Sequence, residues 1–466
     1  MVFYKREGAL ERCGAKFSTL FAINLRYPIN DILHCLRIRE YKLALHTLGV
    51  VDVVAGIRAA RFTAEDVVRS CLNRILQRDA LIKAWAHFDA EAAIKDAQLR
   101  AGHIGPLAGV PFGVKDIIET GALPTEMGAQ AYRGYRPRYD AACVGIACKA
   151  GGLVLGKTIS AEFAGTQPTN TANPHNINHT SGGSSSGSAA AVADFMVPFA
   201  FGTQTGGSIL RPAAFCGIVG FKPTFGLYST AGTKTAAHSF DTIGLLARSV
   251  SDTIAVHAAM VSDAAETAVQ KPSAPRFGFF PSHLWGTVQD DMREVMEDVL
   301  RDISEAKGKV TQVATPPGFE TITQHRAVIN AFERARGLAG EASTHLETFS
   351  AQTIEVWERG IAITGENYLM ARRAVDDFRA TAKRLFTDID VILSPTTPGE
   401  APIGKSYAGD PRLQELWTML HLPSISIPAG RGRRGLPLAV QLVGRAYDDF
   451  PLLAHALWLS AALGRQ

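Results

Sequence analysis

Two serines in glycine-rich stretches and one lysine upstream of them are the residues of this 466-residue chain whose types and spacing could do chemistry. Ser184 lies in a Gly-Gly-Ser-Ser-Ser-Gly stretch, and Ser208 ends a Thr-Gly-Gly-Ser stretch 24 positions later. Lys115 lies 69 positions before Ser184, at the end of Phe-Gly-Val-Lys. A serine hydroxyl becomes a nucleophile when a base takes its proton, and lysine is a known alternative to histidine as that base. The pattern therefore predicts a serine nucleophile that is served by a lysine.

A lysine acts as a base only when its amine is neutral, and its ordinary pKa of about 10.4 makes the neutral form rare near pH 7. Burial lowers the pKa of a lysine because it penalises the charged form. The apolar run Val110–Val114, directly before Lys115, is typical of a buried strand. The sequence therefore predicts that Lys115 is buried and uncharged.

Each glycine run suits a different task. Gly206 and Gly207 lack a Cβ, so a substrate carbonyl can approach their backbone N–H groups beside the Ser208 hydroxyl. This predicts an oxyanion hole made of backbone. Gly182 and Gly183 can hold Ser184 in a conformation that larger neighbours would forbid, where a short hydroxyl can relay a proton.

These segments resemble the amidase signature family, whose hydrolases use a Ser–cis-Ser–Lys triad. The resemblance begins near residue 50, continues to the C-terminus, and is carried further by 106–120, 156–165, 217–227, 240–252 and 436–445. It implies an α/β fold with a mixed central β-sheet between α-helices, and an amidase that needs no metal and no organic cofactor. It also implies that Lys115 is the base, Ser184 the proton relay after a cis peptide bond, and Ser208 the acylated nucleophile. The oxyanion donors would then lie at Thr205, Gly206 and Gly207.

Within that family the chain looks most like malonamidase-type members, in the stretches 124–138, 202–217 and 409–418. Most family members have Asp where this chain has Gln204, and Arg two residues after the nucleophile. Here Leu210 stands at that position and the arginine follows as Arg211. The resemblance implies that Arg211 binds a substrate carboxylate through two hydrogen bonds, so that the substrate is a small, malonamate-like amide. The alternatives are an amidase of other aliphatic or aryl amides and an amidotransferase A-subunit-like protein, although those subunits look like the Asp-containing pattern.

Composition and charge fit a globular enzyme, with 46% hydrophobic and 20% charged residues. Residues 1–46 hold eight Lys or Arg against four Asp or Glu and so carry the whole net charge of +4. The charge-balanced remainder argues against a nucleic-acid partner. We expect a single amidase domain over 47–466. The basic leader is open to three interpretations, namely a stretch absent from the working protein, a transit-like segment or an N-terminal helix, and we expect it to be dispensable.

Cysteine usage and hydropathy indicate a reduced, cytoplasmic protein. The six cysteines form no C-x-x-C pair, and no apolar run reaches 18 residues, so neither a disulfide scaffold nor a membrane partner is expected. His175 and His179 are the one histidine pair with ligand spacing, but their Asn- and Pro-containing context disfavours a metal site. The expected partner is a small-molecule amide, and the oligomeric state stays open, a homodimer included.

Two other motifs compete with this interpretation. Gly151–Thr158 has the spacing of a Walker A phosphate loop, but a predicted helix precedes it and three apolar residues would occupy the phosphate cradle. Gly183–Gly187 fits the G-x-S-x-G elbow and would make Ser185 the nucleophile, with His421 or His455 as its base. Neither histidine lies in a recognisable loop context, so this second motif is disfavoured as well as the first.

Hydrophobic periodicity predicts alternating helices and strands. We expect helices over 63–78, 141–150 and from 188 to 193, and strands over 107–118, 153–155, 197–203, 391–394 and 424–428. The period of residues 285–385 is mainly helical, and we expect this region to cover or line the site. Asp116 and Asp241 lie near the motifs and are expected to be structural hydrogen-bonding residues.

Overall fold

The computed structural model describes residues 45–261 and 274–464. The basic leader therefore lies outside the described residues, except for Leu45 and His46. Leu45 is buried, and the His46 backbone N–H donates to Ser70 Oγ over 3.0 Å. Since these two residues pack with the folded part, a truncation that tests whether the leader is dispensable has to end before Leu45.

The main sheet of the described residues has eleven strands, in the order β1-β3-β2-β6-β8-β7-β12-β13-β11-β9-β10. Its strands are β1 (Trp85–Phe88), β2 (Pro111–Lys115), β3 (Leu153–Thr158), β6 (Phe199–Gln204), β7 (Val219–Lys222), β8 (Thr242–Ala247), β9 (Arg276–Phe279), β10 (Lys309–Gln312), β11 (Val391–Pro395), β12 (Ser424–Arg431) and β13 (Pro437–Val443). A separate two-stranded sheet pairs β4 (Ala172–Asn173) with β5 (Asn176–Thr180).

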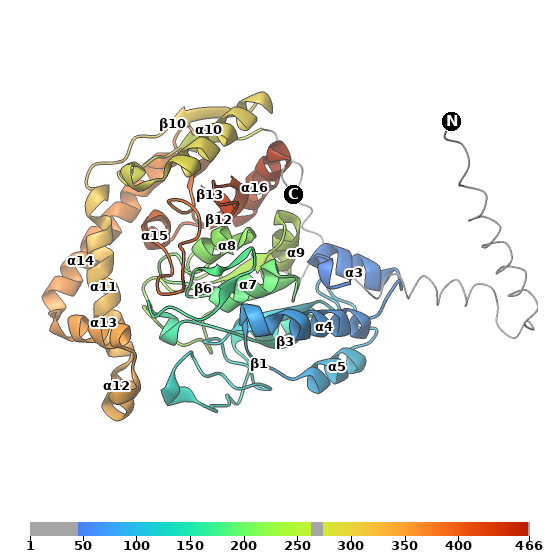
Figure 1. The fold of residues 1–466 in the computed structure, drawn as a ribbon. Helices are drawn as coiled ribbons and strands as arrows, with labels where there is room; N and C mark the ends of the chain where they lie inside the picture. The colour runs from blue at the N-terminus through green and yellow to red at the C-terminus, as the bar shows by residue number, and fades with distance from the viewer. Residues whose placement is uncertain (1–44, 262–273, 465–466) are drawn as a thin grey trace, which may run out of the picture. The chain divides into compact units, whose positions relative to one another are not determined.

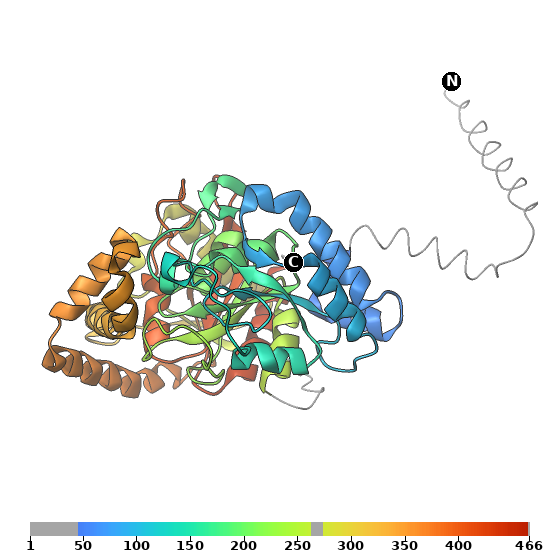
Figure 2. The same cartoon turned by 90° about the horizontal axis from the view of Figure 1, so that it is seen from below.

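Helices surround this sheet (Figures 1 and 2). The α-helices are α3 (Val50–Arg58), α4 (Ala64–Ile82), α5 (Ala90–Leu99), α6 (Ala142–Lys149), α7 (Ser186–Ala193), α8 (Leu210–Cys216), α9 (Val250–Val261), α10 (Asp290–Glu305), α11 (Ile322–Gly337), α12 (Ala339–His345), α13 (Ala351–Ala362), α14 (Gly365–Ala382), α15 (Arg412–Met419) and α16 (Asp449–Leu463). Short 3-10 helices are η1 (Leu45–Thr47), η2 (Gln130–Tyr132), η3 (Glu162–Ala164), η4 (Trp285–Thr287), η5 (Phe319–Thr321), η6 (Leu346–Thr348) and η7 (Lys383–Phe386).

The sheet is mixed, as predicted. β2 runs parallel to both of its neighbours, β3 and β6. The next pairs along the sheet are antiparallel, namely β6 with β8, β8 with β7, β7 with β12 and β12 with β13. Because the carboxyl ends of parallel strands meet at one edge of a sheet, the ends of β2 and β6 lie together. The fold thereby brings Lys115 close to the loop that carries Ser208.

The burial of the central strands shows that the sheet is covered on both faces. Every residue of β2, β6, β7, β8, β11 and β13 is buried, which is the pattern of a sheet packed between layers. The core includes Phe112 stacked on Phe199 at 5.1 Å between ring centroids. α7, made of small residues, is buried along almost its whole length and contacts both β2 and β6. Its short side chains let the helix lie close to the strands that hold the site.

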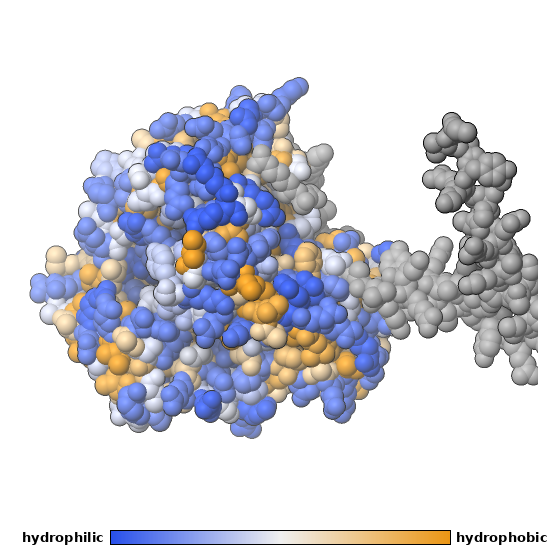
Figure 3. Space-filling model, in the orientation of Figure 1, coloured by the Kyte–Doolittle hydropathy of each residue, from blue (hydrophilic) through white to orange (hydrophobic). Residues whose placement is uncertain are grey.

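A helical layer lies to one side of the sheet, at the left of Figure 1. α11 contacts α13, α14 and α15, and these helices lie between residues 322 and 419. This agrees with the prediction that 285–385 is mainly helical. On the face shown in Figure 3 the surface is mostly hydrophilic, with small separate apolar patches. Among the described residues, no helix is both long enough and apolar enough to cross a membrane.

Most of the expected elements are present, with differences at their ends. Thr63 begins α4 with the predicted capping box, because its hydroxyl accepts from the Asp66 N–H and Asp66 accepts from the Thr63 N–H. The helix continues to Ile82, past the predicted end. The strand expected over 107–118 is shorter, because Gly109 takes a positive φ of 73° in a turn before β2 begins at Pro111.

Lys222, at the end of β7, is one of three fully buried lysines among the described residues, with Lys115 and Lys157, and gives a prediction about stability. Burial lowers its pKa to about 7, partly opposed by Asp449. In the unfolded chain its pKa is about 10.4, so between about pH 7 and 10 only the unfolded state takes up the proton. The free energy of unfolding should therefore rise with pH across this window. The measurement is the midpoint temperature of thermal unfolding as a function of pH. We expect this midpoint to rise less steeply with pH in Lys222→Met than in the wild type, whereas the exposed control Lys383→Met should keep the wild-type slope. Equal slopes in all three proteins would contradict this.

Candidate active site

Lys115 is the last residue of β2 and is fully buried. Its Nζ donates to Ser184 Oγ over 2.7 Å and to Thr203 Oγ1 over 2.8 Å. Burial holds the pKa of Lys115 well below its usual range, and nearby Asp241 opposes this shift only in part. The two hydroxyls therefore contact an amine that the protein interior favours in its neutral form.

Ser184 lies in the loop before α7, and the peptide bond between Gly183 and Ser184 is cis, as the resemblance predicted. Gly182 has a φ of 83°, and a Cβ on it would lie 2.8 Å from Pro212 Cα, so only glycine fits there. The Ser185 N–H donates to the Ser208 carbonyl over 3.3 Å. This hydrogen bond joins the loop of Ser184 to the loop of Ser208.

The loop of Ser208 connects β6 to α8 and is held by Gln204. Gln204 Oε1 accepts from the N–H groups of Ile209 and Leu210 over 2.8 and 3.0 Å, and Gln204 Nε2 donates to Thr418 Oγ1 over 3.0 Å. Thr418 in turn donates to the Gly206 carbonyl over 2.6 Å. A neutral amide can accept from the start of α8 and donate to Thr418 at the same time, whereas an ionised carboxylate can only accept.

The predicted oxyanion donors lie in this loop. Thr205 Oγ1 donates to Asp241 Oδ1 over 2.6 Å, and Asp241 Oδ2 accepts from two further N–H groups, those of Ala236 and Ala237. Asp241 is thus a hydrogen-bonding residue, as expected. Within the described residues, the backbone N–H groups of Gly206, Gly207 and Ser208 have no hydrogen-bond partner. Unpaired N–H groups beside a serine hydroxyl can receive the negative oxygen of a tetrahedral intermediate.

A pocket with a volume of about 230 Å³ opens over both serines. This volume is below the range usual for drug-sized ligands, so it suits a small molecule. Its walls come from the two serine loops and α8, from the segment 161–169, from α11 and α13, and from the segment before α15 together with α15 itself. The lining residues used below are Gln167, Ser184, Gly206, Ser208, Arg211, Arg326, Asn330, Arg334 and Glu415.

Arg211 lies in α8, lines the pocket and is only 8% exposed. Its Nη1 donates to the Gly409 carbonyl, and its Nη2 donates to the Gly183 carbonyl over 2.7 Å. Its Nε is buried and has no partner among the described residues. Burial lowers the pKa of Arg211 to about 10, and Glu415 opposes the shift. Two of its nitrogens therefore hold the loops on either side of the pocket.

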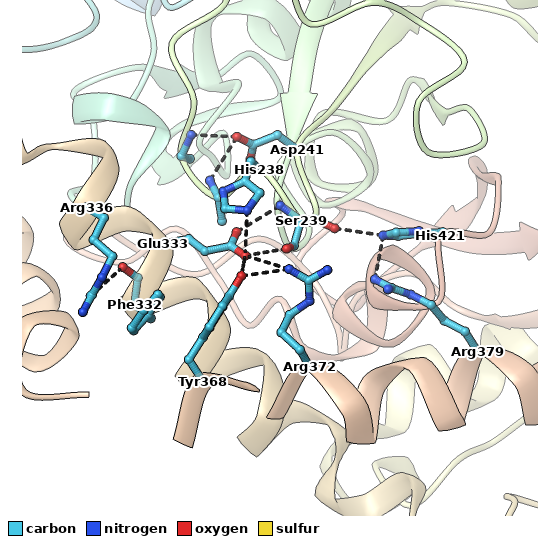
Figure 4. A network of polar contacts seen from close by, with 12 residues as sticks. His238, Ser239, Asp241, Phe332, Glu333, Arg336, Tyr368, Arg372, Arg379 and His421 are labelled. Atoms are coloured by element: carbon cyan, nitrogen blue, oxygen red, sulfur yellow. Dashed lines mark hydrogen bonds and ion pairs between the residues drawn. The ribbon is translucent and has the colours of Figure 1, made fainter. Parts of the chain in front are cut away.

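Figure 4 shows a buried polar network that fixes α11 beside the site. Glu333 on α11 accepts from the Ser239 N–H over 2.9 Å, from the Ser239 hydroxyl, and from Tyr368 OH over 2.8 Å. Arg372 lies 3.5 Å from the same carboxylate. Ser239 belongs to the segment that leads into Asp241, so the network links the position of α11 to that of the Thr205 partner.

The structure gives neither competing motif the arrangement its chemistry needs. Lys157 and Thr158 lie in β3, and Lys157 is fully buried in an ion pair of 3.1 Å with Asp116, so no phosphate loop is present there. Asp116 is thus a structural partner, as expected. Ser185 is fully buried, and its hydroxyl bonds to the backbone of Thr203. His421 instead bonds to Arg379 and to the Ser239 carbonyl.

The two histidines with ligand spacing bond to backbone carbonyls instead of to one another. His175 Nε2 lies 2.9 Å from the Cys216 carbonyl, and His179 Nδ1 lies 2.8 Å from the Ala401 carbonyl. In residues 45–261 and 274–464, no group of three or more His, Cys, Asp or Glu side chains could hold a metal ion.

Sequence reasoning missed part of the site. Thr203 lies two residues before Thr205 and contacts Lys115, but it is outside the glycine-rich motif. Arg326, Asn330 and Arg334 recur every fourth residue on α11, a spacing that places them on one face of a helix. That periodicity was readable from the sequence, although nothing in it showed which way the face would point.

Known proteins match this chain over most of its length. A family model described as Amidase matches residues 66–453. The A subunit of the glutamyl-tRNA(Gln) amidotransferase from Natranaerobius thermophilus is 31% identical, over 87% of this chain and 94% of the relative. The native peptide amidase from Stenotrophomonas maltophilia, a solved structure, is 26% identical with a TM-score of 0.77, and 89% of this chain and 97% of that one are covered.

A further solved structure, described as an amidase, is 28% identical with a TM-score of 0.82, and 89% of this chain and 99% of that one are covered. The family model spans well over half of the chain and includes Lys115, Ser184 and Ser208. The chain therefore belongs to the amidase signature family and is an enzyme that acts on the C–N bond of amides.

Proposed function

We propose that this protein hydrolyses a small amide that bears a carboxylate, as malonamate does, through an acyl-enzyme on Ser208. Lys115 is the base, Ser184 relays the proton, and Thr205, Gly206 and Gly207 supply the oxyanion hole. The observation that carries this proposal is the 2.7 Å contact of a buried Lys115 Nζ with Ser184 Oγ, next to a pocket that both serines line. The substrate is a small-molecule amide, and none of these roles draws on a metal or an organic cofactor.

The reaction proceeds in two acyl transfers. Neutral Lys115 takes a proton from Ser184, which takes one from Ser208, while the Ser208 oxygen bonds to the amide carbonyl carbon. The backbone N–H groups stabilise the resulting oxyanion. The C–N bond then breaks, the proton returns through Ser184 to the leaving nitrogen, and an ester remains. Water then gives up a proton through Ser184 to Lys115 and attacks the ester carbonyl. As the C–O bond to Ser208 breaks, that proton returns through Ser184 to Ser208 Oγ, and the acid is released.

The charge of the pocket supports an acidic substrate. Three guanidinium groups, those of Arg211, Arg326 and Arg334, line it against one carboxylate, that of Glu415. An anionic substrate reduces this excess of positive charge. The small volume supports a short chain between the carboxylate and the amide. The malonamidase-type substrate rests on these observations and on the sequence pattern around Arg211.

A second candidate is an amidotransferase A-subunit-like protein. The relative from Natranaerobius thermophilus favours it, since that protein bears the name of such a component. Such a protein would work with partner subunits, whereas a stand-alone amidase needs none. Gln204, in place of the Asp of the more common pattern, favours the stand-alone enzyme. The described cysteines are free thiols, which supports a cytoplasmic location for either.

Product release distinguishes the candidates. Purified protein is incubated with malonamate, succinamate, malonamide, nicotinamide, an aryl anilide and glutamine, and released ammonia or aniline is measured with Ser208→Ala as the blank. We expect kcat/KM for malonamate or succinamate to exceed that for malonamide by at least tenfold. A preference for neutral amides would overturn the acidic substrate. Release from glutamine alone would favour the amidotransferase-like candidate.

A further inference from the structure

One face of α11 brings three polar side chains to the pocket. Arg326, Asn330 and Arg334 lie four residues apart, and all three line the cavity. Arg334 is already engaged, because it donates to the Phe163 carbonyl over 2.9 Å and to the Ala164 carbonyl over 3.5 Å. Asp241 lies near enough to offset the charge of Arg334. Arg326 and Asn330 differ from Arg334, because each keeps a side-chain atom without a partner among the described residues, although Arg326 Nη1 is paired with Glu415.

Arg326 lies directly against the oxyanion loop. A Cβ built on Gly206 would be 2.6 Å from Arg326 Nη2 and 3.3 Å from Glu415 Oε1. The guanidinium therefore occupies the space over Gly206, beside the backbone that is expected to bind the reacting carbonyl. Arg326 Nη1 forms an ion pair of 2.8 Å with Glu415, and their side chains are only 16% and 7% exposed. A short acyl chain bound at Ser208 would lie within reach of this ion pair.

Several residues that line the pocket carry a buried polar atom without a partner among the described residues. These atoms are the Nε atoms of Arg211 and Arg326 and the side-chain oxygens of Asn330 and Gln167. A buried polar atom without a hydrogen bond is costly, and native proteins keep few of them. Two guanidinium N–H donors match a carboxylate, and the two amide oxygens match the N–H groups of an amide. The set fits a substrate that carries both groups.

The charges near the oxyanion loop give the number of negative charges the substrate should carry. Arg211 is influenced by both Arg326, which repels it, and Glu415, which attracts it, so the three groups lie close together. Asp241 offsets the charge of Arg334, and Asp410, which also attracts Arg211, is paired with Arg412. The remaining two guanidinium groups, those of Arg211 and Arg326, against the one carboxylate of Glu415 leave one positive charge to be balanced. Glu415 would repel a second substrate carboxylate. The cluster therefore fits a monoanion.

We propose that Arg326 is a specificity-determining residue that binds the substrate carboxylate together with Arg211, and that Glu415 restricts the pocket to amides with a single negative charge. This inference rests on the proposed hydrolysis of acidic amides and names the residues that select them. The substrate class that follows is the half-amide of a short dicarboxylic acid.

The test compares Arg326→Gln, the charge-balanced double variant Arg326→Gln/Glu415→Gln, and Arg373→Gln as a control. Arg373 is an exposed arginine on the neighbouring helix α14. We expect both Arg326 variants to lose about 100-fold in kcat/KM for malonamate, mainly through KM, and less than threefold for malonamide. Arg373→Gln should match the wild type. The double variant keeps the test valid if Arg326→Gln alone leaves Glu415 unpaired and unfolds the protein.

Binding without turnover separates this inference from the proposed function. Calorimetry measures the binding of malonate, a dianion, to the Ser208→Ala protein and to the same protein that also carries Arg326→Gln or Glu415→Gln. We expect Arg326→Gln to weaken malonate binding at least tenfold and Glu415→Gln to strengthen it about tenfold. Equal malonate binding with and without Arg326, or an unchanged malonamate-to-malonamide ratio, would overturn the role of Arg326 even if amides are hydrolysed. Failure to hydrolyse any amide, with Arg326-dependent malonate binding intact, would overturn the proposed hydrolysis and leave the anion site standing.

Discussion

Replacing Lys115 with methionine lowers kcat by a factor of about 10⁴ or more, since the loss of one member of a nucleophile–base unit has effects of this size. Methionine has a similar length and no basic nitrogen, so Ser184 loses the acceptor for its proton. The buried position at the end of β2 suits an uncharged side chain, because burial disfavours the ammonium form there. We therefore expect the thermal stability of this variant to stay close to that of the wild type. The measurement is steady-state ammonia release from the best amide.

Lys115→Arg separates the base from a mere positive charge. An arginine side chain keeps the charge and the hydrogen-bond donors but does not deprotonate in proteins. We expect it to be as inactive as Lys115→Met, at a lower thermal stability. An arginine variant with a tenth or more of wild-type activity would contradict the assignment of Lys115 as a base.

Replacing Ser208 with alanine removes the nucleophile and lowers kcat by a factor of about 10⁴ to 10⁶. Ser208 is 8% exposed and faces the pocket, so the change removes one hydroxyl and leaves the packing of the loop intact. In the wild type, quenching the reaction with acid should trap an acyl group on the peptide that contains Ser208, detectable by mass spectrometry. The alanine variant should carry none.

Ser185→Ala is the matched control, because Ser185 lies beside Ser184 and is the serine that the G-x-S-x-G elbow would name. Its hydroxyl bonds to the Thr203 backbone inside the core, and we expect its loss to cost less than tenfold in kcat. An acyl group on Ser185, or full activity of Ser208→Ala, would contradict the assignment of the nucleophile.

The sequence predicted the parts of the site that depend on local chemistry. The glycines around Ser184 and Ser208, the apolar run before Lys115 and the capping residue Thr63 all act on their own neighbourhood, so their roles could be inferred without tertiary contacts. The α/β class followed from the alternation of apolar periods. The family model then confirmed the resemblance to the amidase signature family.

Contacts between distant segments could not be predicted in the same way. Arg211 bonds to the carbonyls of Gly183 and Gly409, which lie far from it on either side in sequence. The orientation of α11 depends on the buried carboxylate of Glu333, whose partners come from the segment before Asp241 and from α14. Periodicity placed Arg326 on a face of a helix, but only tertiary packing determines that this face meets the oxyanion loop.

The most direct test of the account is the rate of acylation of Ser208 as a function of pH, followed by the burst of ammonia from a single turnover. Only the neutral form of Lys115 can accept a proton, so acylation should slow as the pH falls through the pKa of Lys115. Because burial holds that pKa well below the ordinary value of about 10.4, the decline should lie at a correspondingly lower pH. Lys115→Arg should show no burst at any pH. A burst of equal rate in Lys115→Arg, or a wild-type acylation rate that increases as the pH falls, would contradict the account.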